Sequence, residues 1–158
     1  HRLMSEDNPY RKYKHATLVG HSHGGNVNKI AKNILEENGW TVDIINISTP
    51  QRADFQQDSK GKGVNLNFYS NGDLIQWIGV DNFDFDTEDN QGPLGSRLDP
   101  KSSNYKISGA NLLVNWIKNA AGHSYHNDVM SQDEIEKVIK QKFSHIKPNE
   151  HVSKTPSN

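Results

Sequence analysis

The sequence predicts an α/β domain in which helices cover both faces of a mostly parallel sheet. Three observations support this prediction. Short apolar runs bounded by turn residues recur along the first half of the chain, a helical pattern separates the first run from the second, and the intervals between runs suit parallel crossovers. The 158 residues suffice for one domain with one core.

The first two predicted elements are a strand and a helix. Residues 16–19 form a short apolar run that ends at Gly20, as expected of a buried strand. A helix follows, and Asn38-Gly39 provides its end. The apolar residues of this helix recur at helical spacing and form one apolar face, made of Val27, Ile30, Ala31, Ile34 and Leu35.

Further strands and a last helix complete the predicted fold. Apolar residues mark strands over 42–47 and 64–69, each closed by turn-forming residues, and a fourth strand is predicted over 111–117. The last helix is predicted over 131–143, because Ser131 and Glu134 form a capping box ahead of an apolar face. The polar residues 144–158 are expected to form a disordered tail.

Residues 79–105 interrupt this pattern and show no periodicity. They carry five carboxylates over 81–89, followed by several glycines and prolines. A connection of this length in a small domain is usually functional. We therefore expect it to be an acidic, lid-like insertion.

The composition excludes several classes of function. The charges nearly balance, with 18 Lys plus Arg against 19 Asp plus Glu, so a nucleic-acid partner is not expected. The chain has no cysteine, which excludes disulfides and thiolate zinc sites, and no apolar run is long enough to span a membrane. Only 32% of the residues are apolar, and adding the 12 glycines still leaves the share below the ~45–50% of an ordinary domain.

The segment Gly20-His21-Ser22-His23-Gly24-Gly25 is the strongest chemical signal in the chain. A serine flanked by glycines between a strand and a helix is typical of a nucleophile elbow, whose sharp turn lifts the hydroxyl above the sheet edge. Glycines are expected where a side chain would strike the neighbouring strand or helix. The backbone amides at the start of the helix point at an anion and would stabilise an oxyanion that develops during the reaction.

This segment resembles the nucleophile elbow of α/β-hydrolases of the lipase and esterase-like branch. The resemblance implies a Ser, Asp, His order, with the acid in the turn after the next-but-one strand and the histidine shortly before the last helix. Asp73 occupies the first place, after the strand predicted over 64–69. The spacing to the last helix favours His126 as the base, and His123, which follows a glycine, is the alternative.

The other candidate sites are weaker, and no cofactor or metal is expected. The four histidines at positions 21, 23, 123 and 126 offer nitrogen ligands for zinc, but no carboxylate stands at ligand spacing beside them. The alternating acids of 84–89 lack the glycine of an EF-hand loop, so a solvated acidic loop is the preferred interpretation. His15 is expected to be a solvated surface residue, while His21 and His23 are expected to pack around the elbow.

The expected function is hydrolysis of carboxylic esters, with lipids as the expected substrates. A triad of Ser22, His126 and Asp73 would act through an acyl-enzyme. The backbone amide of His23 is the expected oxyanion donor. The alternative is a catalytically silent module with a hydrolase-like fold that serves binding or assembly.

The resemblance also implies that the early strands of the fold are missing from this chain. Only nineteen residues precede Gly20, too few for these strands and for the loop that supplies a second oxyanion donor. We therefore expect residues 1–143 to be the C-terminal portion of a hydrolase domain, completed by an N-terminal portion of the same hydrolase or by another chain. A chain that begins at His1 also suits a domain released from a longer secreted polypeptide, such as a toxin or effector.

Overall fold

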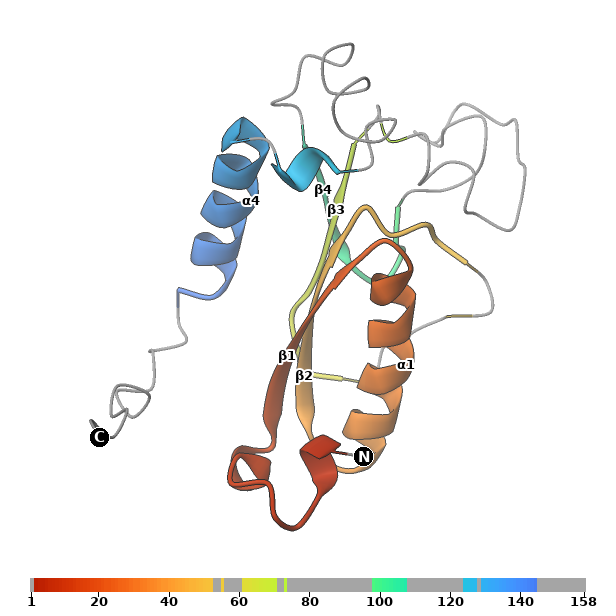
Figure 1. Ribbon diagram of the computed structural model, residues 1–158, viewed down its shortest axis with the longest axis vertical. Helices are drawn as coiled ribbons and strands as arrows, with labels where there is room; N and C mark the ends of the chain where they lie inside the picture. Colours follow the sequence, from red (N-terminus) through yellow and green to blue (C-terminus); the bar gives the residue numbers. More distant parts are fainter. Residues whose placement is uncertain are drawn as a thin grey trace, which may run out of the picture.

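The computed structural model describes residues 2–52, 55, 61–70, 73, 98–107, 124–127 and 129–144. Its sheet has four strands in the order β1-β2-β3-β4, and each strand pairs in parallel with the next. The strands are β1 (His15–His21), β2 (Thr41–Ile47), β3 (Asn65–Tyr69) and β4 (Ser103–Lys106). The predicted parallel sheet is therefore confirmed (Figure 1).

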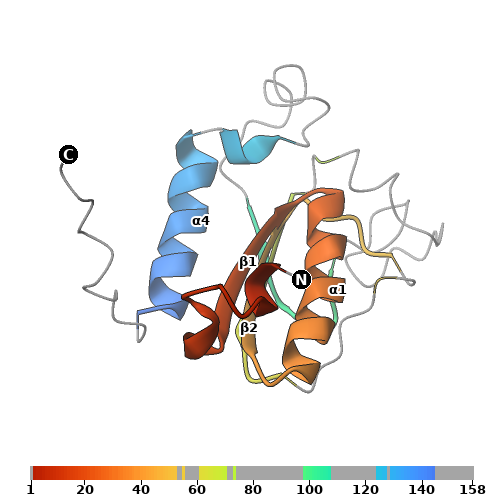
Figure 2. The ribbon, with the colours of Figure 1, turned by 60° about the horizontal axis from the view of Figure 1, so that its bottom comes forward.

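Two α-helices cover opposite faces of this sheet, α1 (His23–Glu37) and α4 (Val129–Lys142). Successive residues of a strand point to opposite faces, and on β2 the side chain of Val42 packs with Leu35 of α1 whereas Ile45 packs with Ile135 of α4. The views in Figures 1 and 2 agree with this placement. Short 3-10 helices η1 (Arg2–Met4) and η2 (Arg11–Tyr13) precede β1, and η4 (Tyr125–Asn127) precedes α4.

The apolar core lies mainly between the sheet and α4. Burying an aliphatic or aromatic side chain contributes about 1.5–3 kcal/mol, and β2, β3 and α4 supply most of these side chains. The buried members of this core are Ile45, Leu66, Phe68, Ile107 and Ile135. The cluster on the α1 side is smaller and consists of Leu35, Trp40 and Val42.

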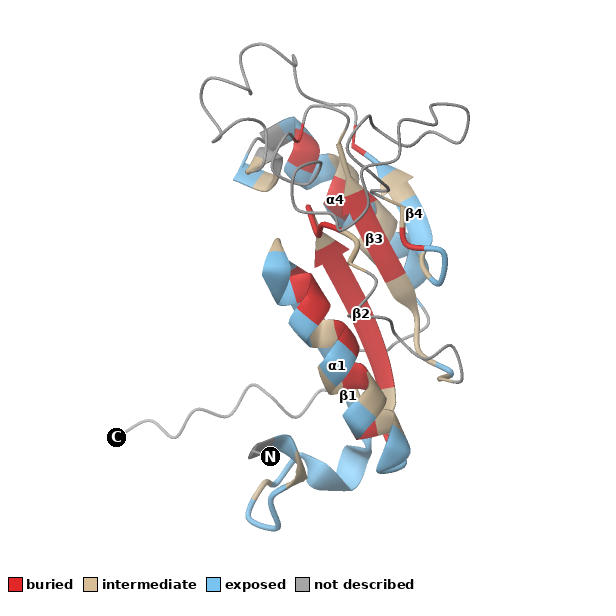
Figure 3. Cartoon of the chain, turned by 90° about the vertical axis from the view of Figure 1, so that its right-hand side faces the viewer, coloured by how far each residue is buried: buried red, intermediate tan, exposed pale blue. Residues whose placement is uncertain are grey.

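Most of the apolar face of α1 does not pack on the sheet. The helix ends at Asn38 and Gly39 as expected, with Gly39 at φ 78°. However, the side chains of Val27, Ile30 and Ile34 are 61%, 41% and 45% exposed. The buried residues are instead Gly25, Asn26, Lys29, Lys32 and Leu35. The outward face of α1 is exposed (Figure 3) and partly apolar, whereas the contact of α1 with the sheet is largely polar.

Two element boundaries also differ from the prediction. Residues 103–105, expected to belong to the insertion, lie in β4, which has a single apolar residue, Tyr105, and mostly exposed side chains. α4 begins at Val129, so Ser131 lies in its first turn, fully buried, and does not cap the helix. The strand predicted over 111–117, the acids of 81–89 and the tail 145–158 lie outside the described residues, as does most of the insertion.

None of the helices in the described ranges combines the length and the apolar character needed to cross a membrane.

Candidate active site

Ser22 lies in the turn between β1 and α1 and has an unusual backbone conformation. Its φ is 56° and its ψ is −134°, a combination that costs a non-glycine residue about 1–3 kcal/mol and persists only where the surroundings enforce it. Two backbone hydrogen bonds hold the turn: the Ser22 amide donates to the Ile47 carbonyl at 3.0 Å, and the Gly25 amide donates to the Ser22 carbonyl at 3.0 Å. The Ser22 side chain is half-buried and makes no capping hydrogen bond to α1, so its hydroxyl is not committed to the helix.

The glycines around Ser22 are required at two of the three positions. A Cβ atom on Gly20 would lie 2.5 Å from Asn28 Nδ2 and 2.7 Å from the Gly24 carbonyl carbon. A Cβ atom on Gly25 would lie 2.8 Å from both Cβ and Cγ2 of Thr49. A Cβ atom on Gly24 would meet nothing within 4 Å, so the expectation that this glycine avoids a clash is wrong.

Asp73 lies beyond the end of β3, at the same edge of the sheet as Ser22. The register aligns His21 with Ile47 and Ile47 with Phe68, so β1 and β3 reach this edge at the same level. The Asp73 side chain is fully buried, and its backbone amide donates to the Ser70 carbonyl at 3.3 Å. The sheet topology therefore brings the candidate nucleophile and the candidate acid to one edge.

His126 belongs to η4 and lies beside the residue that precedes Ser22. The centroids of the His126 and His21 rings are 4.4 Å apart, with the ring planes tilted by 53°. The His126 side chain is half-buried, and the turn that carries it is closed by the Asn127 amide, which donates to the Ser124 carbonyl at 2.9 Å. The contact places the preferred base at the elbow, whereas the alternative base, His123, lies outside the described residues.

The backbone amide of His23 is the first of α1. The first four amides of a helix have no partner within the helix and together attract negative charge. His23 directly follows Ser22, which is the position from which a nucleophile elbow donates a backbone amide to the oxyanion formed from a substrate carbonyl.

Sequence reasoning missed the polar residues that lie behind the elbow. Asn26 and Asn46 are each 1% exposed, and Thr49 and Ser48 are fully buried. Ser48 has φ 55° and follows β2 as Ser22 follows β1. The signal available in the sequence was the polar run that closes an otherwise apolar strand.

His15 is exposed, as predicted for a surface residue, but it also contacts a buried carboxylate. Its Nε2 atom lies 2.7 Å from Oδ2 of Asp43, a carboxylate on β2 whose side chain is 3% exposed. The Val64 amide donates to the other oxygen of Asp43 at 2.7 Å. This cluster lies near the amino ends of the strands, away from Ser22, and joins β1 to β2 and β3.

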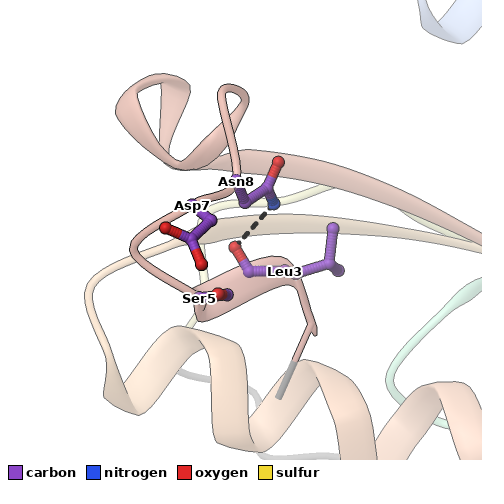
Figure 4. Close-up of a pocket in the computed structure, with 4 residues that line it drawn as sticks. All are labelled: Leu3, Ser5, Asp7 and Asn8. Carbon is purple, nitrogen blue, oxygen red and sulfur yellow. Dashed lines mark hydrogen bonds between the residues drawn. The ribbon is translucent and has the colours of Figure 1, made fainter.

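Two pockets of the described ranges lie away from the elbow, and no metal centre is found in those ranges. There the structure contains no group of three or more histidine, aspartate or glutamate residues that could hold a metal ion. A pocket of about 490 Å³ lies among Leu3, Ser5, Asp7 and Asn8, where the Asn8 side chain donates to the Leu3 carbonyl at 2.8 Å (Figure 4). Another, of about 460 Å³, lies beside the end of α1 and the start of β2.

Comparisons of this chain with protein-family models, with curated proteins and with solved structures find no match.

Proposed function

We propose that this chain is a serine hydrolase that cleaves carboxylic esters, with lipid esters as substrates. The observation that carries the proposal is the strained Ser22 at the β1–α1 turn, with His126 beside its neighbour His21. A serine is held in such a conformation only where the fold enforces it, and such positions cluster at functional sites. The lipid specificity rests on the lipase-like form of the elbow sequence.

In the proposed mechanism the acyl group passes through Ser22. The Ser22 hydroxyl oxygen attacks the ester carbonyl carbon while His126 accepts the hydroxyl proton, and the His23 amide stabilises the resulting oxyanion. The bond to the alcohol then breaks, and His126 gives the proton to the departing oxygen. Water attacks the acyl-enzyme, His126 accepts its proton and returns it to Ser22, and the carboxylic acid leaves.

Asp73 is the proposed acid of the triad, which orients the imidazole and stabilises its charged form. The strands that precede Ser22 and Asp73 are separated by β2 alone, which corresponds to two strand spacings, about 10 Å. A serine, an imidazole and a carboxylate joined by two hydrogen bonds of about 2.8 Å span such a distance. The burial of Asp73 is consistent with a carboxylate that serves a histidine rather than solvent.

Labelling with a fluorophosphonate probe tests the proposal. The probe reacts with a serine hydroxyl only when a nearby base activates it, so we expect one phosphonylated residue, Ser22, and no labelling of Ser22→Ala. The fully buried Ser48 shares the positive φ and serves as an internal control, to be read by mass spectrometry of the labelled peptides. Native protein that stays unlabelled would favour the catalytically silent binding or assembly module.

We also propose that an N-terminal portion of the same hydrolase, or another chain, completes this sheet along β1. Among the described strands, β1 pairs only with β2, so one edge of His15–His21 has no strand beside it. Apolar side chains are exposed on both sides of the sheet: Val19, 65% exposed, lies on the α4 face of β1, and Val27, Ile30 and Ile34 lie on the outward face of α1, which packs on β1 and β2. A chain that adds a strand to β1 and also packs apolar residues on Val19 and on the outward face of α1 would cover these positions.

The mass of the native protein tests this partner. We expect a complex larger than 17.8 kDa in size-exclusion chromatography and native mass spectrometry. Val27→Lys and Ile34→Lys should release the partner while the secondary structure of this chain is preserved, because both side chains are exposed. Glu37→Lys, an exposed position on the same helix, is the matched control. An active, well-folded monomer of 17.8 kDa would contradict the proposal.

A further inference from the structure

We propose that Thr49 is the positioning residue of the elbow, and that its contact with Gly25 sets where Ser22 and the His23 amide stand relative to the sheet. The proposal rests on the proposed function of Ser22 as nucleophile and adds the element that fixes its geometry. Thr49 lies two residues after β2, and its side chain is fully buried against the first turn of α1.

The contact between Gly25 and Thr49 leaves no space for another atom. A Cβ atom on Gly25 would stand 2.8 Å from Cβ and Cγ2 of Thr49, and closer still to its hydroxyl oxygen. Interiors are close-packed and deform little, so a contact of this kind limits how near α1 can approach the end of β2. Thr49 therefore acts as a stop against which the first turn of α1 rests.

Hydrogen bonds on either side of Thr49 hold α1 against this stop. The Asn26 side chain donates to the Pro50 carbonyl at 3.1 Å, and the Asn46 side chain donates to the Gly25 carbonyl at 3.4 Å. The Asn28 side chain donates to Oδ1 of Asn46 at 3.3 Å. Residues 46–50 thus contact the helix at Gly25, Asn26 and Asn28.

The same segment also holds Ser22 directly. The Ser22 amide donates to the Ile47 carbonyl, so residues 46–50 fix both the strained serine and the helix turn three residues later. Ser48, between Ile47 and Thr49, has φ 55°, and its amide donates to the Phe68 carbonyl at 3.0 Å, which ties the segment to β3. A shift at Gly25 would therefore move the Ser22 hydroxyl and the His23 amide together.

Compensating substitutions test this inference on the native protein. Gly25→Ala is expected to lower the maximal rate of fluorophosphonate labelling at saturating probe by roughly 10- to 100-fold, because a displacement of about 1 Å at a reacting group has effects of this size. The probe concentration at half-maximal rate should change little. Gly25→Ala combined with Thr49→Gly should recover most of the rate, because the removed side chain makes room for the added methyl group.

Gly24→Ala is the matched control, since an added Cβ there meets nothing within 4 Å. Thr49→Gly alone removes the other half of the contact and should also lower the maximal rate. If Gly25→Ala does not fold, Thr49→Gly and the double variant together still test the inference. Thermal unfolding curves show whether each variant is folded before its labelling rate is compared. Equal rates for Gly25→Ala and Gly24→Ala, or a double variant slower than both single variants, would overturn the role of Thr49. Absence of labelling in the wild-type protein would instead overturn the proposed function.

Discussion

Replacing His126 by alanine is expected to slow the phosphonylation of Ser22 by about 10⁴- to 10⁶-fold, because a serine without its base is a weak nucleophile. The His126 ring lies 4.4 Å from the ring of His21, the residue that directly precedes the candidate nucleophile. The measurement is the rate of fluorophosphonate labelling, followed for the wild-type protein and the variant at equal concentrations of folded protein.

The alternative base, His123, provides the comparison for this experiment. His123→Ala should leave the labelling rate within a few-fold of wild type if His126 is the base, since only loss of the true base costs several orders of magnitude. The reverse pattern, with His123→Ala inactive and His126→Ala active, would transfer the role of base to His123. If both variants were labelled at the wild-type rate, neither histidine would be the base that activates Ser22.

The strands of the sheet were predictable where they are apolar. The runs at 16–19, 42–47 and 64–69 each correspond to a strand, because an apolar run is the signal by which a strand is recognised in a sequence; β2 and β3 lie inside the described sheet and are largely buried, whereas β1 lies at its edge. β4 was missed for the same reason. It lies at the edge of the described sheet, where exposed positions tolerate Ser103, Asn104 and Lys106.

The orientation of α1 was not predictable from the helix alone. Periodicity identified an apolar face, but it does not state which surface covers that face. In the described residues the face toward the sheet holds Lys29 and Lys32. Lys32 pairs with Glu36 one turn along the helix, but the other partners of these ammonium groups lie farther away in sequence, such as Asp99 and the Val42 carbonyl. Such pairs depend on tertiary structure, so no local pattern contains them.

The candidate site was likewise predictable only in part. The position of Ser22 followed from a local pattern of glycines at a strand-to-helix turn, and its positive φ agrees with that pattern. The proximity of His126 to the elbow required the chain to return from more than a hundred residues away, which only the resemblance implied. The role of Thr49 was invisible in the sequence, since it depends on the distance between α1 and the end of β2.

The buried ion pair beneath α1 should have the largest effect on stability. Nζ of Lys29 lies 3.2 Å from Oδ2 of Asp99, and the two side chains are 2% and 3% exposed. Lys29 also donates to Oε1 of Gln51 at 2.5 Å, and Oδ1 of Asp99 accepts from the Lys101 amide at 3.0 Å. The pair thus links α1 to the segment after β2 and to the segment before β4.

Lys29→Met is expected to lower the free energy of unfolding by about 3–5 kcal/mol, because it leaves the Asp99 carboxylate buried without a counter-charge. Adding Asp99→Asn to Lys29→Met should restore part of this loss, since the amide is neutral and its oxygen can still accept from the Lys101 amide. Urea unfolding of the native protein measures both changes.

An exposed ion pair in the same chain provides the matched control. Lys140 lies 2.5 Å from Oε1 of Glu136 on α4, with side chains 73% and 59% exposed. Lys140→Met is expected to cost about 0.3–0.5 kcal/mol, because water screens both charges and solvates the one that remains. If Lys29→Met cost no more than Lys140→Met, the Asp99 carboxylate would have to be neutral or hydrated. In that case the polar contacts between α1 and the sheet would not explain why the apolar residues of α1 face outward.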